Sequence, residues 1–257
     1  MKSIRIIPRI DIKGPNVVKG IHNEGLRVVG NPVELARRYY KEGADEIIYM
    51  DIVASLYQRN LDFDLLKSVA EVIFIPLTAG GGIRSTNDIN NALRAGADKI
   101  AINTYAIHHP DFLTEAVRKF GSQCIVLSVE AKKKDGNFWE AYTDGGRERT
   151  NINVIEWIRQ GIELGVGEII ITSIDQEGTK SGFDELLIKQ ISEIATVPLI
   201  VHGGAGSMET FKQIIGYGSI DAVCASSVFH YQDYSIKDLK KYLLKQKINI
   251  RPYDIES

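Results

Sequence analysis

The feature that most constrains the fold is an internal repeat built around two glycine clusters. Residues 78–85 read TAGGGIRS, and residues 201–207 read VHGGAGS. Each cluster follows an apolar run opened by proline and precedes a helical pattern, which predicts a strand, a tight loop and a helix N-terminus. Glycine amides can approach an anion closely, and a helix N-terminus adds partial positive charge. Two such loops predict a ligand with two anionic groups.

The two clusters belong to a longer duplication. The interval from Gly80 to Gly203 equals that from Asp98 to Asp221, and each of these aspartates opens another apolar run that ends in small polar residues. Similar shifts relate residues 43–46 to 165–168, and Asp11 to Glu130. We therefore expect a duplicated half, with half-repeats of about residues 1–122 and 123–245 and a C-terminal tail over 246–257.

Short β-branched runs alternate with longer helical patterns along the whole chain, which is typical of βα units around a parallel sheet. The expected strands cover residues 4–11, 46–51, 73–78, 98–103, 124–130, 168–173, 198–202 and 221–225. The expected helices lie near 32–43, 62–71, 85–95, 110–120, 151–164, 184–195, 207–217 and 235–245. Repeats of this unit over 257 residues predict one (β/α)8 TIM barrel domain, residues 1–257, and a doubly wound open sheet is the alternative.

Two connections are longer than is usual in such a barrel. They span residues 13–32 and 132–150, and Asp135-Gly136 is expected to form a hairpin turn in the second. Both follow strand C-termini, where the active sites of barrel enzymes lie. Loops that close over a substrate are one interpretation, and surface insertions are the other.

Composition excludes several classes of partner. The net charge is −2, and 44% of the residues are hydrophobic. No basic block suggests a nucleic-acid partner, and no apolar run is long enough to suggest a membrane. The first apolar run begins at Ile4, so we expect no signal peptide and a cytoplasmic protein. Cys124 and Cys224 lie in apolar runs, lack metal-ligand spacing and are expected to be buried thiols; we expect neither a metal nor a cofactor.

The polar residues at strand ends are the candidates for chemistry, because barrel strands point their last residues into the site. Asp11 and Glu130 are related by the repeat and should face each other across the barrel mouth. Opposed carboxylates in different surroundings can divide acid and base roles. The remaining candidates are Asp51, Thr78, Asn103, Thr104, Thr172, Asp175, His202, Ser226 and Ser227.

Lys19, Asp175 and His202 are interpreted individually. Lys19 could meet a phosphate or activate a carbonyl, or it could be an exposed loop lysine. Asp175 lies in the polar, glycine-containing segment 173–182, which fits a loop that orders on binding. His202 could donate a proton, or it could be satisfied by a backbone carbonyl.

Four charged residues lie near strand starts and should gather at the opposite, N-terminal face. They are Arg5, Glu46, Lys99 and Glu168. Charges at the base of a barrel are costly unless they pair with one another, so we expect a ring of two cations and two anions. Such a ring can be a stabilising plug, which is the simpler interpretation from physics alone.

The chain resembles the cyclase subunit of imidazole glycerol phosphate synthase over nearly its whole length. The resemblance is carried by these segments: RIIPRIDIKG, NPVELARRY, EGADEIIYMDIVAS, FIPLTAGGGIRS, RAGADKIAINT, FGSQCIVLSVEAK, GEIIITSIDQEGTKSGFD, HGGAGS and ASSVFH. It implies a carbon–nitrogen lyase of histidine biosynthesis that works with a separate glutaminase subunit. Ammonia from that subunit would pass through the barrel and react with a bisphosphorylated ribulosyl-formimino-carboxamide nucleotide. The implied products are imidazole glycerol phosphate and an aminoimidazole carboxamide ribotide.

The resemblance also implies roles for particular residues. It places acid/base catalysis on Asp11 and Glu130. It places one phosphate at Gly81, Gly82 and Thr104, and the other at Gly203, Gly204 and Ser226; we add Lys19, Asn103, Asp175 and Ser227 to the expected substrate contacts. It makes the ring of Arg5, Glu46, Lys99 and Glu168 an ammonia gate, so the glutaminase would form a heterodimer at the N-terminal face.

Three positions depart from the family pattern. The family has aspartate at Glu130, a small residue at Arg9 and serine at His202, and a misplacement of about 1 Å can cost about a hundredfold in rate. These departures leave an alternative open, namely a paralogous ammonia-channelling subunit for amidation of a nucleotide- or glycan-linked sugar. A bisphosphate-binding isomerase is a third interpretation, but it would need no ammonia gate.

Overall fold

The computed structural model describes residues 3–253, and within this range eight parallel strands close into a barrel. The barrel strands are β1 (Arg5–Lys13), β4 (Ile47–Asp51), β5 (Leu77–Gly80), β6 (Lys99–Ile102), β7 (Ile125–Lys133), β10 (Glu168–Ser173), β11 (Leu199–His202) and β12 (Ala222–Ala225). Their order around the barrel is β10, β11, β12, β1, β4, β5, β6 and β7, and pairing of β7 with β10 closes the circle. The expected (β/α)8 architecture is confirmed. The last four residues of the expected tail lie outside the described range.

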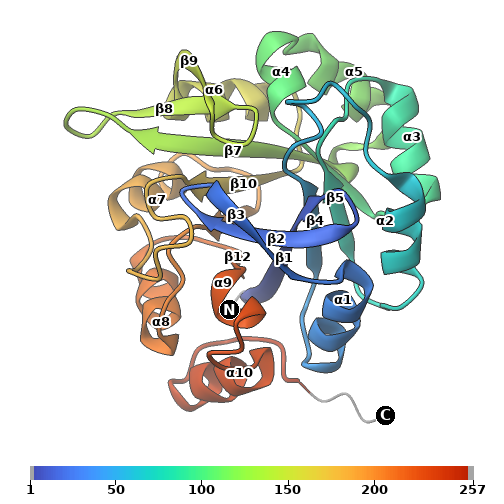
Figure 1. Ribbon diagram of the computed structural model, residues 1–257. Helices are drawn as coiled ribbons and strands as arrows, with labels where there is room; N and C mark the ends of the chain where they lie inside the picture. The colour runs from blue at the N-terminus through green and yellow to red at the C-terminus, as the bar shows by residue number, and fades with distance from the viewer. Residues whose placement is uncertain (1–2, 254–257) are drawn as a thin grey trace.

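Helices surround the barrel, as Figure 1 shows. The helices are α1 (Pro32–Lys41), α2 (Phe63–Ala70), α3 (Thr86–Arg94), α4 (Thr104–His108), α5 (Asp111–Phe120), α6 (Val154–Glu163), α7 (Glu185–Ser192), α8 (Met208–Tyr217), α9 (Ser227–His230) and α10 (Ile236–Lys245), with a 3-10 turn η1 (Ser122–Cys124). Side chains cap the first turns of several of them. Asn31, for example, accepts from the amides of Val33 and Glu34 at the start of α1, which stabilises a helix end by about 1 kcal/mol.

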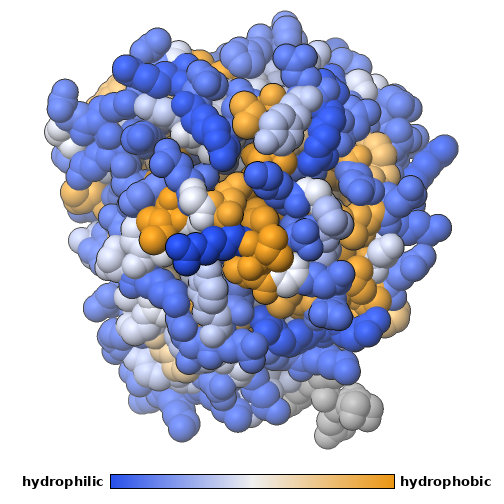
Figure 2. Space-filling view, in the orientation of Figure 1, coloured by the Kyte–Doolittle hydropathy of each residue, from blue (hydrophilic) through white to orange (hydrophobic). Residues whose placement is uncertain are grey.

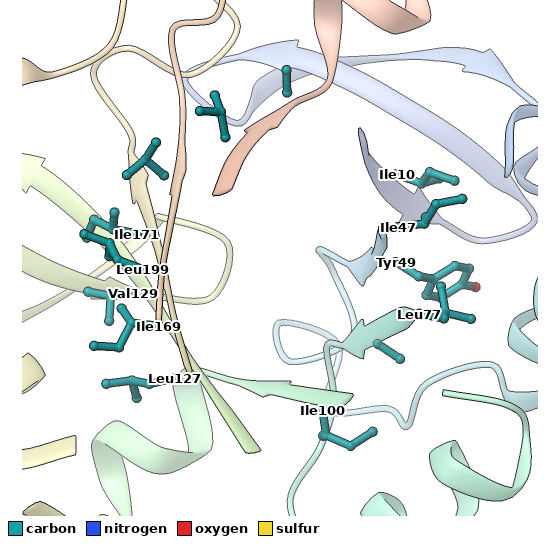
Figure 3. Close-up of a cluster of buried hydrophobic side chains, with 14 of the residues drawn as sticks. Ile10, Ile47, Tyr49, Leu77, Ile100, Leu127, Val129, Ile169, Ile171 and Leu199 are labelled. Atoms are coloured by element: carbon teal, nitrogen blue, oxygen red, sulfur yellow. The ribbon is translucent and has the colours of Figure 1, made fainter. Parts of the chain in front are cut away.

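The main hydrophobic core lies between the strands and the surrounding helices. Figure 3 shows side chains of this layer from several strands: Ile10, Ile47, Tyr49, Leu77, Ile100, Leu127, Val129, Ile169, Ile171 and Leu199. A second, smaller apolar cluster fills the barrel interior with alternate residues of the same strands, including Ile7, Ile48 and Ile170. The two clusters follow from the period of two along each strand. Cys124 and Cys224 are buried, as expected.

The two long connections form β-hairpins, of which the sequence predicted only the turn at Asp135-Gly136 in the second. After β1 the chain forms β2 (Asn16–Ile21) and β3 (Glu24–Gly30), and after β7 it forms β8 (Trp139–Thr143) and β9 (Glu148–Asn153). β2 pairs with the end of β1, and β8 pairs with the end of β7, because those barrel strands run on beyond the barrel rim. The turn at Asp135-Gly136 lies between β7 and β8, as expected.

The order of elements is the same in the two halves of the chain. Each half begins with a barrel strand and a hairpin, and a short helix follows its fourth barrel strand, namely α4 in the first half and α9 in the second. In Figure 1 the β2–β3 hairpin crosses the face of the barrel that is turned toward the viewer. The hairpins and short helices therefore surround one mouth of the barrel.

Several predicted ends were wrong, and two predicted starts were wrong by three residues or more. The third barrel strand begins at Leu77 rather than at residue 73. Its pairing with β4 starts where Leu77 lies opposite Ile47, and the apolar residues 72–75 belong to the connection before the strand. The helix expected from residue 151 begins at Val154, because residues 148–153 belong to β9. Asn153 then caps the helix by accepting from the amide of Ile155.

The surface around the mouth is mostly hydrophilic, with hydrophobic side chains gathered near the centre of the view in Figure 2. The β2–β3 hairpin contributes exposed Ile21 and Val28. Among residues 3–253, no helix combines the length and the apolar character that crossing a membrane would require.

Candidate active site

A closed ring of ion pairs lies at the N-terminal end of the barrel. Arg5 contacts Glu46 at 2.7 Å and Glu168 at 2.5 Å. Lys99 contacts the same two carboxylates at 2.9 Å and 2.7 Å. Each cation therefore touches both anions, which offsets the cost of placing charge at the barrel base. Thr78 adds a hydrogen bond from its hydroxyl to Glu46 at 2.6 Å.

The first glycine cluster lies beside an open cavity of about 360 Å³ at the opposite end. Gly81 and Gly82 have φ angles of 98° and 70°, a backbone region that glycine adopts readily. Asn103 and Thr104 begin α4 on the neighbouring strand end, and Glu130 reaches the same cavity from β7. The structure thus brings five of the predicted site residues together around a space large enough for a ligand.

The second glycine cluster is closed. The cavity beside Gly203, Gly204, Ser226 and Ser227 measures only about 10 Å³, which is room for about one water molecule. The segment after β10 covers it, because the amide of Gly182 donates to the carbonyl of Gly204 at 2.8 Å. The β2–β3 hairpin lies against the same segment.

Two contacts join the hairpin to that segment. The amide of His22 donates to the carbonyl of Glu177 at 2.8 Å, and the His22 imidazole bonds the carbonyl of Ile174 at 3.0 Å. A ligand can enter the second glycine cluster only if the β2–β3 hairpin and the segment after β10 both move away from it. The two glycine clusters are therefore alike in sequence but differ in access.

Asp11 lies in a buried polar cluster with Arg9 and Lys19. Its Oδ1 accepts from Arg9 Nε at 2.6 Å, and its Oδ2 accepts from Lys19 Nζ at 3.2 Å. Lys19 also contacts Glu177, so it is a buried residue of β2 and not an exposed loop lysine. Burial opposes ionisation of Asp11, but Arg9 and Lys19 outweigh it and hold the pKa of that carboxyl below its ordinary value.

Glu130 has different surroundings from those of Asp11. It accepts from the Nδ2 of Asn103 at 3.4 Å and from the amide of Gly146. Burial raises the pKa of Glu130 from an ordinary 4.5 to about 7, although the nearby Arg9 acts in the other direction. The carboxyl can therefore gain and lose a proton near neutral pH.

His202 and Asp175 are placed differently. The His202 imidazole bonds the hydroxyls of Thr172 at 3.4 Å and Ser226 at 3.3 Å, and burial lowers its pKa well below the ordinary value, so it is neutral. Asp175 lines neither cavity, and its carboxylate accepts from the amide of Lys133 at 2.7 Å. In this conformation the hydrogen bond of Asp175 connects the segment after β10 to the end of β7.

Sequence reasoning missed Glu177 as a member of the buried cluster. Its side chain is 2% exposed and lies 3.7 Å from His202 as well as against Lys19. The available signal was its place in the polar segment that follows β10. Nothing in the local sequence showed that the segment would fold inward.

We expect Gly204→Ala to lower the free energy of unfolding by about 1–3 kcal/mol or more. Gly204 has a φ of 102°, and a Cβ there would overlap the carbonyl of Gly182. Gly216→Ala is the matched control, because a Cβ at that position of α8 meets nothing within 4 Å; it should stabilise the chain slightly. Urea denaturation of both variants checks the prediction, and equal stabilities would contradict it.

Comparisons with known proteins agree on one family. The chain matches the family described as "Histidine biosynthesis protein" over residues 5–235. A protein of Legionella pneumophila named imidazole glycerol phosphate synthase subunit HisF is 56% identical over 212 residues, which are 82% of this chain and 100% of the relative. A protein of the same name from Helicobacter hepaticus is 48% identical over 247 residues, which are 96% of this chain and 98% of the relative. This chain therefore belongs to the histidine biosynthesis protein family, in which its relatives are HisF subunits of imidazole glycerol phosphate synthase.

Proposed function

We propose that this chain is the ammonia-using cyclase subunit of an imidazole glycerol phosphate synthase. It would convert a bisphosphorylated ribulosyl-formimino-carboxamide nucleotide to imidazole glycerol phosphate and an aminoimidazole carboxamide ribotide, which is a carbon–nitrogen lyase reaction. The observation that carries the proposal is the arrangement of two glycine clusters at one barrel mouth, with Glu130 lining the first cavity and Asp11 in the buried cluster with Lys19. Both relatives carry the name of this subunit, which does not favour the sugar-amidation alternative.

Each part of the site has a task in this reaction. The amides at Gly81 and Gly82 and the start of α4 would hold one phosphate, and those at Gly203 and Gly204 and the start of α9 the other. Lys19 would bind substrate once Glu177 moves away from it. The two carboxylates would supply the negative charge and the proton transfer that ring closure and bond cleavage require.

The direct test is turnover of purified chain with the nucleotide substrate and an ammonium salt. Formation of both products, followed by chromatography, is the expected result. Absence of turnover under conditions in which an authentic cyclase works would overturn the proposal. Replacing the ammonium salt by glutamine and a glutaminase subunit then tests delivery of ammonia through the ring of Arg5, Glu46, Lys99 and Glu168.

The N-terminal face offers a surface for the glutaminase. Phe74 is 84% exposed in the turn before β5 and packs edge-on against Tyr40, with ring centroids 5.9 Å apart. A groove lined by Phe74, Ile73 and Pro76 extends to Asp98, which precedes Lys99 of the ring. Exposed aromatic side chains are frequent anchors of protein interfaces.

We expect Phe74→Ala to weaken binding of the glutaminase subunit by about tenfold or more, because removing an interface anchor costs about 2 kcal/mol. Isothermal titration calorimetry measures the change. Leu186→Ala is the matched control, since Leu186 is also exposed but lies in the first turn of α7, at the other end of the barrel. Equal affinities of the two variants would contradict docking at the Phe74 surface.

A further inference from the structure

Arg9 is a large cation buried inside the barrel. Its side chain is 2% exposed and points into the interior, as do the other odd-numbered residues of β1 from Arg5 to Asp11. Its Nε donates to Asp11 on the same strand, and its Nη1 donates to the hydroxyl of Thr172 at 3.2 Å. Thr172 belongs to β10, and β11 and β12 separate β10 from β1 around the barrel. The guanidinium therefore reaches across the barrel interior and donates to Asp11 on β1 and to Thr172 on β10.

The contacts of Arg9 and Lys19 leave Asp11 little freedom to accept a proton. Each of its two oxygens accepts from a different buried cation. Protonation of Asp11 would weaken these charge-assisted hydrogen bonds. Lys19 also contacts Glu177, but among residues 3–253 the buried Arg9 has no other carboxylate contact to replace Asp11. Asp11 also lines neither of the two cavities at the mouth.

Glu130 is free of such a contact. Its hydrogen-bond donors are the neutral amides of Asn103 and Gly146. The charges that face it are Arg9 and Asp11 on β1 and Arg147 between β8 and β9. Because Glu130 lines the open cavity, a ligand bound there can exchange a proton with it.

We propose that Arg9 is a positioning residue that fixes Asp11 as a permanent carboxylate and thereby leaves proton exchange with the substrate to Glu130. The proposal rests on the proposed function for the identity of that substrate. Ionised Asp11 would then act through its charge and by orienting Lys19, and Glu130 would carry the proton. The repeat makes the two carboxylates equivalent in sequence, and Arg9 makes them unequal.

Carbon-13 NMR of the carboxyl groups tests this division without any turnover. The unliganded chain, labelled at its Asp and Glu carboxyls, is titrated from pH 4 to 9, and Asp11→Asn and Glu130→Gln assign the two signals. We expect the Glu130 signal to titrate near neutral pH and the Asp11 signal to remain that of a carboxylate throughout. Titration of Asp11 above pH 5 in the unmodified chain, or no titration of Glu130, would overturn the proposal.

Arg9 variants test the cause. In Arg9→Met the midpoint of Asp11 should rise by about 1–3 pH units, which is the effect of removing one close opposite charge. Arg9→Lys keeps the cation and should keep Asp11 ionised, which also serves if the methionine variant does not fold. Arg59→Met is the matched control, because Arg59 pairs with Asp51 at 2.7 Å rather than with Asp11. An unchanged Asp11 in Arg9→Met would overturn the role of Arg9.

The pH dependence of turnover links the division to the reaction. The unmodified chain should show a break in kcat at the midpoint of Glu130, and Arg9→Met should gain a second break at the new midpoint of Asp11. A break that stays in place in Glu130→Gln would overturn the proposal. If the NMR result holds while no turnover of the nucleotide occurs, the proposed substrate fails and the role of Arg9 stands.

Discussion

Replacing Glu130 by Gln is expected to lower kcat by about 10²–10⁴ while the chain still binds its substrate, because a positioned acid or base contributes a factor of that size. Glutamine keeps the length of the side chain and can still meet Asn103 and the amide of Gly146. What it removes is the carboxyl that gains and loses a proton near neutral pH. Steady-state kinetics with ammonium salt measure kcat and KM separately.

Glu130→Asp is the matched control for this loss. It keeps an ionisable carboxyl but moves it by about 1 Å, which can cost about a hundredfold. We expect its kcat to lie between those of the unmodified chain and of Glu130→Gln. If Glu130→Gln retains full kcat, Glu130 is not the proton-transfer group.

Glu130→Gln should also change how the free energy of unfolding depends on pH. Because burial raises the pKa of Glu130 from 4.5 to about 7, the folded chain keeps a proton that the unfolded chain loses between these values. The contribution of Glu130 to stability is therefore fully present below pH 4.5 and is lost as the pH rises to about 7. Across that window the unmodified chain should lose stability relative to Glu130→Gln, as measured by urea denaturation at each pH.

The sequence predicted the barrel because its evidence was local and repeated. Each strand has an apolar run, each helix has its own period, and the glycine clusters mark where strands end. The same repeat placed Gly81, Gly82, Thr104 and Glu130 around one mouth, where the structure has them lining one cavity.

What the sequence could not predict depends on contacts between distant segments. The hairpins form because β1 and β7 continue past the rim and offer free edges to β2 and β8, and polar residues in those strands masked the pattern. The segment that closes the second glycine cluster brings Glu177 against Lys19, two residues far apart in the chain. The path of Arg9 to Thr172 across the barrel is likewise a tertiary contact without a sequence signal.

A buried ion pair between Lys240 and Asp45 lies at the N-terminal end of the barrel, next to the ring of Arg5, Glu46, Lys99 and Glu168. Lys240 of α10 is 1% exposed, and its Nζ donates to Asp45 Oδ1 at 2.7 Å. The other oxygen of Asp45 accepts from the amide of Ile6 at 2.8 Å. Asp45 precedes Glu46, and Ile6 follows Arg5, so this pair joins α10 to the two segments that carry half of the ring.

Lys240→Met is therefore expected to lower the free energy of unfolding by about 3–5 kcal/mol, because it leaves the carboxylate of Asp45 buried without its counter-ion. Methionine fills a similar volume, so the loss reports the charge rather than a cavity. Lys245→Met, an exposed site on the same helix, is the matched control and should change stability by less than about 0.5 kcal/mol. Equal stabilities of the two variants in urea denaturation would show that the pair does not hold the base. Because Asp45 positions both neighbouring ring segments, the same variant should also lower glutamine-dependent turnover more than ammonium-dependent turnover.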